Sequence, residues 1–258
     1  SEQAKDFNQD YETYNRNNLY GSDLFSLANQ IEDYNKKEAD GKAYGRIEMK
    51  VTLKTEIINA VKKISTIIGK DNIYIRYDPI FLSDKYNIDY HIKAFNKLCT
   101  LLKGYVNTII VSFLDEYKNV LKNKNILKYR QFTENEYKLI GENFSNIART
   151  NNMVVQTCFE DRNLTEYGFK KGECLSHELA YKLTGKTYKS WKARKERKCE
   201  CVEMVDIGCY NSCKHFCKYC YANYDEKMVN ENFKNHDVNS SLLCGNLKKD
   251  DIIKVRNK

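Results

Sequence analysis

Residues 108–113 read TIIVSF, a continuous apolar run that is short for a helix and rich in β-branched residues. Such a run is typical of a strand that is buried on both faces, as in a parallel sheet. Two similar runs flank it in the sequence, IYIRYDP at residues 73–79 and MVVQTC at residues 153–158. The three runs predict three strands of one parallel sheet.

Segments with helical periodicity alternate with these runs. Apolar residues recur at helical spacing over residues 52–68, 88–104 and 134–150, and Gly69 is well placed to end the first segment. Helices that alternate with buried strands indicate right-handed β-α-β units. We therefore expect an α/β fold with a partial (β/α) barrel-like parallel sheet, because three strands are too few to close a barrel.

Further elements and boundaries are predicted outside this core. Helical spacing recurs over residues 22–35, after the capping residue Ser22, and over residues 176–184. The chain begins without an initiator Met, so we expect a fragment whose missing part carries the rest of the sheet; the alternative is that residues 1–43 contribute degenerate strands. The expected organisation is a poorly defined N-terminal segment at 1–43, the partial barrel at 44–185, a basic segment with a cysteine-rich metal module at 186–245, and a tail at 246–258.

Composition excludes several classes of protein. With 258 residues, 41% of them hydrophobic and 30% charged, the chain can bury a core without disulfide bonds and is not broadly disordered. It has no run of about 18 apolar residues and opens with no secretory leader, which predicts a cytoplasmic protein with no membrane partner. The net charge of +8 favours weak attraction to polyanions.

A basic segment lies between Lys186 and Lys198, where seven basic residues accompany one acid and Trp191. A nucleic-acid site with a stacking aromatic ring has this composition, and so does a solvated linker. Nucleic acid is therefore retained as a candidate partner, with the solvated linker as the alternative.

The ten cysteines are concentrated near the C-terminus, with six of them between Cys199 and Cys220. In a reducing compartment, such a cluster more often holds a metal than disulfide bonds. Cys213, Cys217 and Cys220 form a C-x3-C-x2-C run with Tyr219 directly before the last cysteine. Three thiolates this close in sequence can ligate three irons of one cubane cluster and leave the fourth iron open.

Two other metal sites fit the same region of the sequence. A tetrahedral zinc site could take four thiolates, with His215 as a further nitrogen ligand, from a set such as Cys199, Cys201, Cys213 and Cys217. A closed four-cysteine iron–sulfur cluster could instead recruit Cys209. Either alternative describes a non-catalytic metal-binding protein.

Acidic residues follow the predicted strands at their carboxyl ends, where parallel α/β folds place their sites. They are Asp78, Asp115 and Glu160. An acid at this position can also simply cap the next turn or helix. We predict that Arg76, Asp78 and Asp115 line a cavity for a cofactor or substrate.

The C-x3-C-x2-C run, with its aromatic residue, resembles the signature of radical-SAM enzymes. That resemblance implies a 4Fe-4S cluster on Cys213, Cys217 and Cys220 whose open iron chelates S-adenosylmethionine. It also implies an electron donor such as flavodoxin or ferredoxin, and a 5′-deoxyadenosyl radical that abstracts hydrogen from an unknown substrate. Tyr219 would then lie beside the cofactor.

Separated motifs over about residues 44–245 resemble an uncharacterised bacterial family catalogued as domain of unknown function 1848, whose C-terminal cysteines are similar to the radical-SAM signature. The motifs include RYDPI at 76–80, VSFLDEYK at 111–118, the segment 213–223 and SLLCG at 241–245. The family pattern also implies a second metal site assembled from Cys158, Cys174, Cys199 and Cys201. Residues 1–43 do not match, so the chain resembles a truncated or rearranged member, with its cysteine run after the strands as in a permuted arrangement.

Overall fold

The computed structural model describes residues 54–158, 160, 162–173, 175–190, 201–203, 208–240, 242, 244–247 and 249–252, together with Ile47. The chain divides into residues 1–46 and 47–258, so every described residue belongs to the second unit. Some predictions fall outside the described residues: the helix at 22–35, Trp191 with the basic residues that follow it, and two proposed metal ligands, Cys174 and Cys199.

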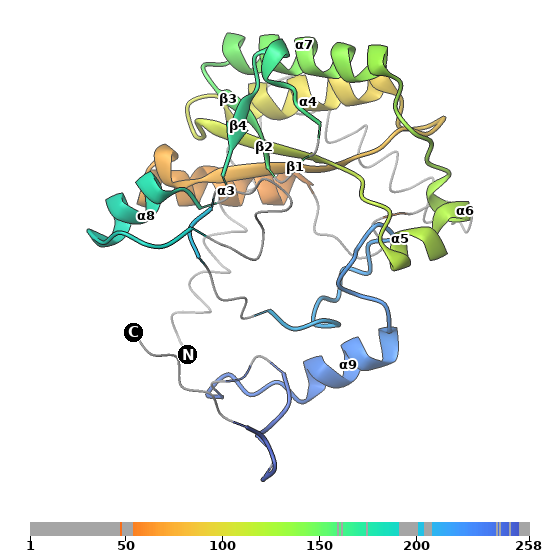
Figure 1. Cartoon of the computed structure of the whole chain (residues 1–258), viewed down its shortest axis with the longest axis vertical. Helices are drawn as coiled ribbons and strands as arrows, with labels where there is room; N and C mark the ends of the chain where they lie inside the picture. The colour runs from red at the N-terminus through yellow and green to blue at the C-terminus, as the bar shows by residue number, and fades with distance from the viewer. Residues whose placement is uncertain are drawn as a thin grey trace, which may run out of the picture. The chain divides into compact units, whose positions relative to one another are not determined.

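Four parallel strands form one open sheet in the order β1-β2-β3-β4 (Figure 1). Their bounds are β1 Tyr74–Ile80, β2 Thr108–Phe113, β3 Val154–Cys158 and β4 Lys170–Gly172. The first three strands match the three apolar runs to within one residue at each end. Their spatial order follows their order in the chain, as expected of successive β-α-β units. The α/β prediction is confirmed, and the sheet formed by the described strands is not closed.

The helices lie between and after the strands. The long helices α4 and α7 lie side by side against the sheet (Figure 1), and α3, α4, α7 and α8 agree with the predicted segments. The bounds are α3 Lys54–Ile68, η1 Lys70–Asn72, α4 Ile88–Leu102, α5 Lys118–Lys122, α6 Lys124–Leu127, α7 Glu134–Thr150, η2 Thr165–Tyr167, α8 His177–Thr184 and α9 Glu226–Lys234. None of the described helices is long and apolar enough to cross a bilayer.

Local signals explain where the helices begin and end. The side chain of Thr133 accepts from the backbone N–H of Glu136, and Glu136 reaches back to Thr133, so α7 opens with a capping box. The Arg130 guanidinium, hydrogen bonded to Glu136, lowers the pKa of that carboxyl to about 2 and keeps it charged. At the end of α3, Gly69 has φ 84°, a conformation that glycine adopts without steric cost.

The main hydrophobic core lies between the helices and one face of the sheet. Phe95 of α4 and Phe144 of α7 stack with their ring centroids 3.8 Å apart, and Tyr77 of β1 meets both rings edge-on. From β2, Ile109 and Val111 are fully buried in the same cluster. This packing fixes which side chains of each strand face the helices and which face the other way.

The opposite face of the sheet is more polar. Arg76 pairs in register with Ile110, which pairs with Gln156, so these three side chains share one side of the sheet. Asp78, two residues after Arg76, lies within β1, which corrects our prediction that it follows the strand. Pro79 falls where the register between β1 and β2 shifts, between Tyr77 and Ile80, and such an irregularity is a position at which a strand tolerates proline.

Candidate functional site

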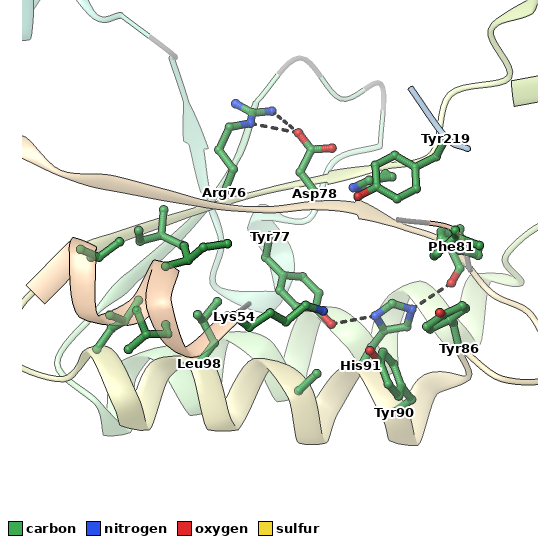
Figure 2. A pocket seen from close by; sticks show the side chains of 18 residues that line it. Lys54, Arg76, Tyr77, Asp78, Phe81, Tyr86, Tyr90, His91, Leu98 and Tyr219 are labelled. Atoms are coloured by element: carbon green, nitrogen blue, oxygen red, sulfur yellow. Dashed lines mark hydrogen bonds and ion pairs between the residues drawn. The ribbon is translucent and has the colours of Figure 1, made fainter. Parts of the chain in front are cut away.

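A pocket of about 340 Å³ lies against β1 (Figure 2). Its apolar walls come mainly from α3 and α4, and its polar groups come from β1 and from both of these helices, which contribute Lys54 and His91. Cavities of this volume are at the small end of those that hold small ligands. Figure 2 shows that Arg76 and Asp78 lie on one side of β1 while Tyr77 and His91 lie on the other, so the pocket meets both faces of this edge strand.

Arg76 and Asp78 form an accessible ion pair on the polar side of β1. Nε and Nη2 of Arg76 donate to Oδ2 of Asp78 at 2.9 and 2.7 Å, and Nη2 also donates to Ser112 Oγ at 2.9 Å. The side chains of Arg76 and Asp78 are 44% and 29% exposed. An ion pair this exposed contributes little to stability, so its charged groups remain available to a polar ligand.

A buried hydrogen-bonded pair lies on the helix side of β1. Tyr77 Oη is 2.9 Å from His91 Nδ1, and His91 Nε2 is 2.9 Å from the carbonyl oxygen of Phe81. Because a carbonyl only accepts, Nε2 carries the proton and Nδ1 accepts the phenol proton. Burial raises the pKa of Tyr77 and lowers the pKa of His91. Both side chains therefore stay neutral near neutral pH.

Neither member of this pair was among the residues predicted to form a site. His91 precedes the buried residues Phe95 and Cys99 on one face of α4. Its place on that apolar stripe is the signal in the sequence that could have predicted a buried, neutral imidazole. Its hydrogen bond to Tyr77 has no such signal, because the partner lies on a different element.

The pair predicts how stability depends on pH. The folded-state pKa of His91 lies below the unfolded value of about 6.5, so the unfolded chain binds more protons between those two values. Stability should therefore be fully present above about pH 6.5 and fall as the pH drops toward the folded pKa. Urea unfolding between about pH 7 and about pH 5 measures this slope.

Two variants test the assignment. In His91→Gln, the amide can donate to Phe81 and accept from Tyr77 without titrating, so this part of the pH dependence should disappear. His91→Ala leaves both partners unpaired and should cost about 3 kcal/mol at neutral pH. A slope in His91→Gln as steep as in the natural chain would contradict the assignment.

The cysteine loop, which we define as residues 211–222, closes on itself at its base. The backbone N–H of Asn211 donates to the carbonyl of Ala222 at 2.9 Å, and the side chain of Asn223 donates to the carbonyl of Cys213. Cys213 is exposed, whereas Cys217 and Cys220 are half-buried. One closed surface loop thus carries all three thiols of the C-x3-C-x2-C run.

Asn211 is the residue that holds this base together. It is fully buried and has φ 55°, a left-handed conformation that asparagine tolerates better than most residues. Its Oδ1 accepts from the backbone N–H groups of Tyr224 and Asp225 at 2.9 and 3.1 Å, and its carbonyl accepts from Asn232 at 3.1 Å. Asn211 therefore fastens the cysteine loop to the start of α9.

Contacts with α5 position the cysteine loop near the carboxyl end of β2. Asn119 Nδ2 donates to the carbonyls of Tyr221 and Asn223 at 3.2 and 3.4 Å, and Asn123 Nδ2 donates to the carbonyl of Lys218 at 2.8 Å. Because α5 follows β2 directly, these bonds hold the loop at the end of the sheet where parallel α/β folds carry their sites (Figure 1).

Tyr219 joins the cysteine loop to the pocket. Its side chain packs against a small core that includes Phe81 and Val120, and it lines the same pocket as Arg76 and Asp78. Figure 2 shows its ring beside Asp78. The residue next to Cys220 thus forms part of the pocket wall.

The donor set of the loop fits a 4Fe-4S cluster by its chemistry, since thiolates are the usual ligands and three of them leave one iron open. Within the described part of the chain, no three His, Cys, Asp or Glu side chains are gathered closely enough to hold a metal ion. Cluster binding would require the three sulfurs to turn toward one centre. The metal module therefore stays a prediction.

The remaining predicted site residues lie apart from the pocket. Asp115 is exposed between β2 and α5 and does not line the pocket. Glu160 accepts from the backbone N–H of Phe113 at 2.8 Å, so it braces the end of β2. Cys201 is buried next to Val202, which forms an isolated bridge with Ser190. The second metal site stays a prediction, because some of its proposed ligands fall outside the described residues.

Comparison with known proteins gives one match. A family model described as domain of unknown function (DUF1848) matches residues 39–222. No curated protein and no solved structure is significantly similar to the chain. The matched range contains both β1, with its pocket residues, and the cysteine loop.

Proposed function

The chain belongs to the family described as domain of unknown function DUF1848, and we propose that it is a radical-SAM-like iron–sulfur protein. Cys213, Cys217 and Cys220 would hold a 4Fe-4S cluster. When bound, that cluster supplies the electron for reductive cleavage of S-adenosylmethionine, which initiates radical chemistry on a substrate still to be identified. One observation carries the proposal: a single closed loop bears all three thiols, and its Tyr219 lines the pocket beside β1.

The pocket residues supply complementary binding groups for such a ligand. The aromatic rings of Tyr86 and Tyr90 line the pocket and suit the planar face of an adenine. Asp78 offers carboxylate oxygens that can accept from ribose hydroxyls or face the sulfonium cation. The guanidinium of Arg76 suits a carboxylate or phosphate on the substrate.

The Tyr77–His91 pair has a positioning role in this proposal. It links β1 to α4 and to the carbonyl of Phe81, and so fixes the strand segment between Arg76 and Asp78. Because both side chains stay neutral, they add no charge that would compete with the ion pair for a charged ligand. This arrangement leaves the binding electrostatics to the Arg76–Asp78 pair.

Anaerobic reconstitution with iron and sulfide tests the proposal. We expect a brown protein with the broad visible absorption of an iron–sulfur cluster and, after dithionite and S-adenosylmethionine are added, 5′-deoxyadenosine detected by mass spectrometry. A colourless protein that takes up zinc instead would contradict the cluster. A brown protein that releases no 5′-deoxyadenosine would contradict the catalytic step and leave the non-catalytic metal-binding alternative.

A further inference from the structure

Two segments that are distant in the sequence meet at the cysteine loop, and neither of them contains an acidic residue. Residues 117–128, which include α5 and α6, carry four lysines, and the cysteine loop carries two more. The hydrogen bonds that Asn119 and Asn123 donate to the loop join the two segments (Figure 1). Folding therefore brings together six lysines and no Asp or Glu in what we call the lysine-rich surface, residues 117–128 and 211–222.

Three of these lysines are well placed to contact a ligand. Lys118 and Lys122 are both exposed and are four residues apart on α5, so they lie on one face of that helix. The backbone of Lys218 is held beside α5, because its carbonyl accepts from Asn123 Nδ2 at 2.8 Å. Within the described part of the chain, none of the three forms an ion pair with an acidic side chain. Their charges are therefore available to an anion.

Two acids directly precede this surface in the sequence, Asp115 and Glu116. The carboxylate of Glu116 is already engaged, because it accepts from Tyr129 Oη at 2.8 Å and lies 3.9 Å from Lys124 Nζ. Asp115 is exposed and opposes the lysines with a single charge. The lysine-rich surface thus keeps a positive charge despite these neighbours.

A pair of accessible aromatic rings lies on the same surface. The ring centroids of Tyr117 and Tyr221 are 5.3 Å apart, with their planes tilted by 39°. The two residues are 39% and 59% exposed. Tyr117 caps the start of α5, and the carbonyl of Tyr221 accepts from Asn119 Nδ2 at 3.2 Å, so both backbones are fixed. Exposed aromatic faces beside lysines are the two components of a site for single-stranded nucleic acid.

Charge alone would also suit an acidic protein as the partner. Protein–protein interfaces, however, are depleted of lysine and enriched in arginine, whereas this surface has six lysines and no arginine. Lysine is a flexible point charge, which contacts phosphate groups without the fixed geometry that arginine requires. The composition of the surface therefore favours a polyanion with planar rings over an acidic protein.

We propose that the lysine-rich surface binds single-stranded nucleic acid. The phosphates contact Lys118, Lys122 and Lys218, and a base stacks on the ring of Tyr221. Phosphate contacts release counterions and stacking accepts any base, so the affinity falls steeply with salt and depends little on sequence. Because no thiol takes part, binding does not require the cluster, and the inference goes beyond the proposed function.

Fluorescence anisotropy of the full, reduced chain with a fluorescein-labelled oligoadenylate RNA of about 12 nucleotides tests the stacking. Tyr221→Ala should weaken binding about tenfold, because it removes the ring on which a base stacks. Tyr221→Phe is the matched control, which keeps the ring and should bind as the natural chain does. A DNA strand of the same sequence, measured in parallel, shows whether RNA or DNA is preferred.

The salt dependence of the same binding tests the phosphate contacts. A variant without the three ligand-contacting lysines should lower the slope of log K against log salt by about 2, since each phosphate contact on a single strand contributes about 0.7. A matched control removes the same charge from lysines on other elements and should keep the natural slope. The test substitutions are Lys118→Gln, Lys122→Gln and Lys218→Gln, and the control substitutions are Lys70→Gln, Lys103→Gln and Lys138→Gln.

Four results would overturn the proposal. Natural affinity in Tyr221→Ala would show that the ring takes no part. A natural salt slope in the triple lysine variant would place the binding elsewhere, for example on the basic segment at 186–198, which every variant retains. Displacement of the RNA by polyglutamate at equal charge would assign the surface to an acidic protein. Equal affinity for a duplex of the same sequence would exclude base stacking. The last two measurements use the natural chain, so they decide even if a variant fails to fold.

Discussion

Replacing any one of Cys213, Cys217 and Cys220 by alanine is expected to abolish cluster binding. Three thiolates are the smallest set that holds a cubane with one open iron, so each substitution leaves only two ligands. The nearest unused thiol in the sequence, Cys209, lies outside the C-x3-C-x2-C run and outside the cysteine loop. We therefore expect the iron bound after reconstitution to fall to the background level in each single variant.

Iron and acid-labile sulfide per chain, with the electron paramagnetic resonance signal of the reduced protein, measure this loss. Cys209→Ala is the matched control, because it makes the same change in the same segment but outside the run, and it should keep the full iron content. Iron loss in Cys209→Ala would favour a closed four-cysteine cluster. Full iron in all three loop variants would remove the basis of the proposed function.

Replacing Asn211 by alanine should open the cysteine loop, although Asn211 carries no metal-binding group. The change removes the acceptor for the backbone N–H groups of Tyr224 and Asp225. It also places alanine at φ 55°, a left-handed conformation that alanine adopts less readily than asparagine. Together these losses should destabilise the loop by about 3 kcal/mol. Cluster content should fall with the stability of the loop.

Hydrogen exchange at the amides of Tyr224 and Asp225 measures the opening, with the amides of β2 as an internal reference that should not change. Asn211→Asp is the conservative partner of Asn211→Ala, because its carboxylate keeps acceptors for both N–H groups. It should retain more protection and more iron than Asn211→Ala. Equal losses in both variants would show that the side-chain acceptor does not hold the loop.

The core of the fold could be predicted because its signals are local. The bounds predicted for β2 and α7 agree with the structure to the residue, since apolar pattern and capping residues both act over a few positions. The short elements β4 and α5 carry too few residues for a periodicity to emerge. The position of α5 depends on distant contacts, which are the buried side chain of Val120 and the hydrogen bonds from Asn119 to Tyr221 and Asn223.

The site was predictable only where its residues are neighbours in the sequence. The spacing of Cys213, Cys217 and Cys220 is visible at once, and so is the alternation that aligns Arg76 with Asp78. Residues that are distant in the sequence and come into contact only in the folded chain have no recognisable spacing in the sequence. The Tyr77–His91 pair was not predicted, because its two partners lie on different elements.

The attachment of the cysteine loop to α5 has a consequence for the order of assembly. The hydrogen bonds of Asn119 and Asn123 with the loop span 95 to 104 positions of the chain. Contacts between residues so far apart carry a large loop-closure cost and are expected to form late in folding. They are also few and partly accessible to water, so local opening should break them before the strands separate. The wall that Tyr219 adds to the pocket would then be the last to form and the first to be lost.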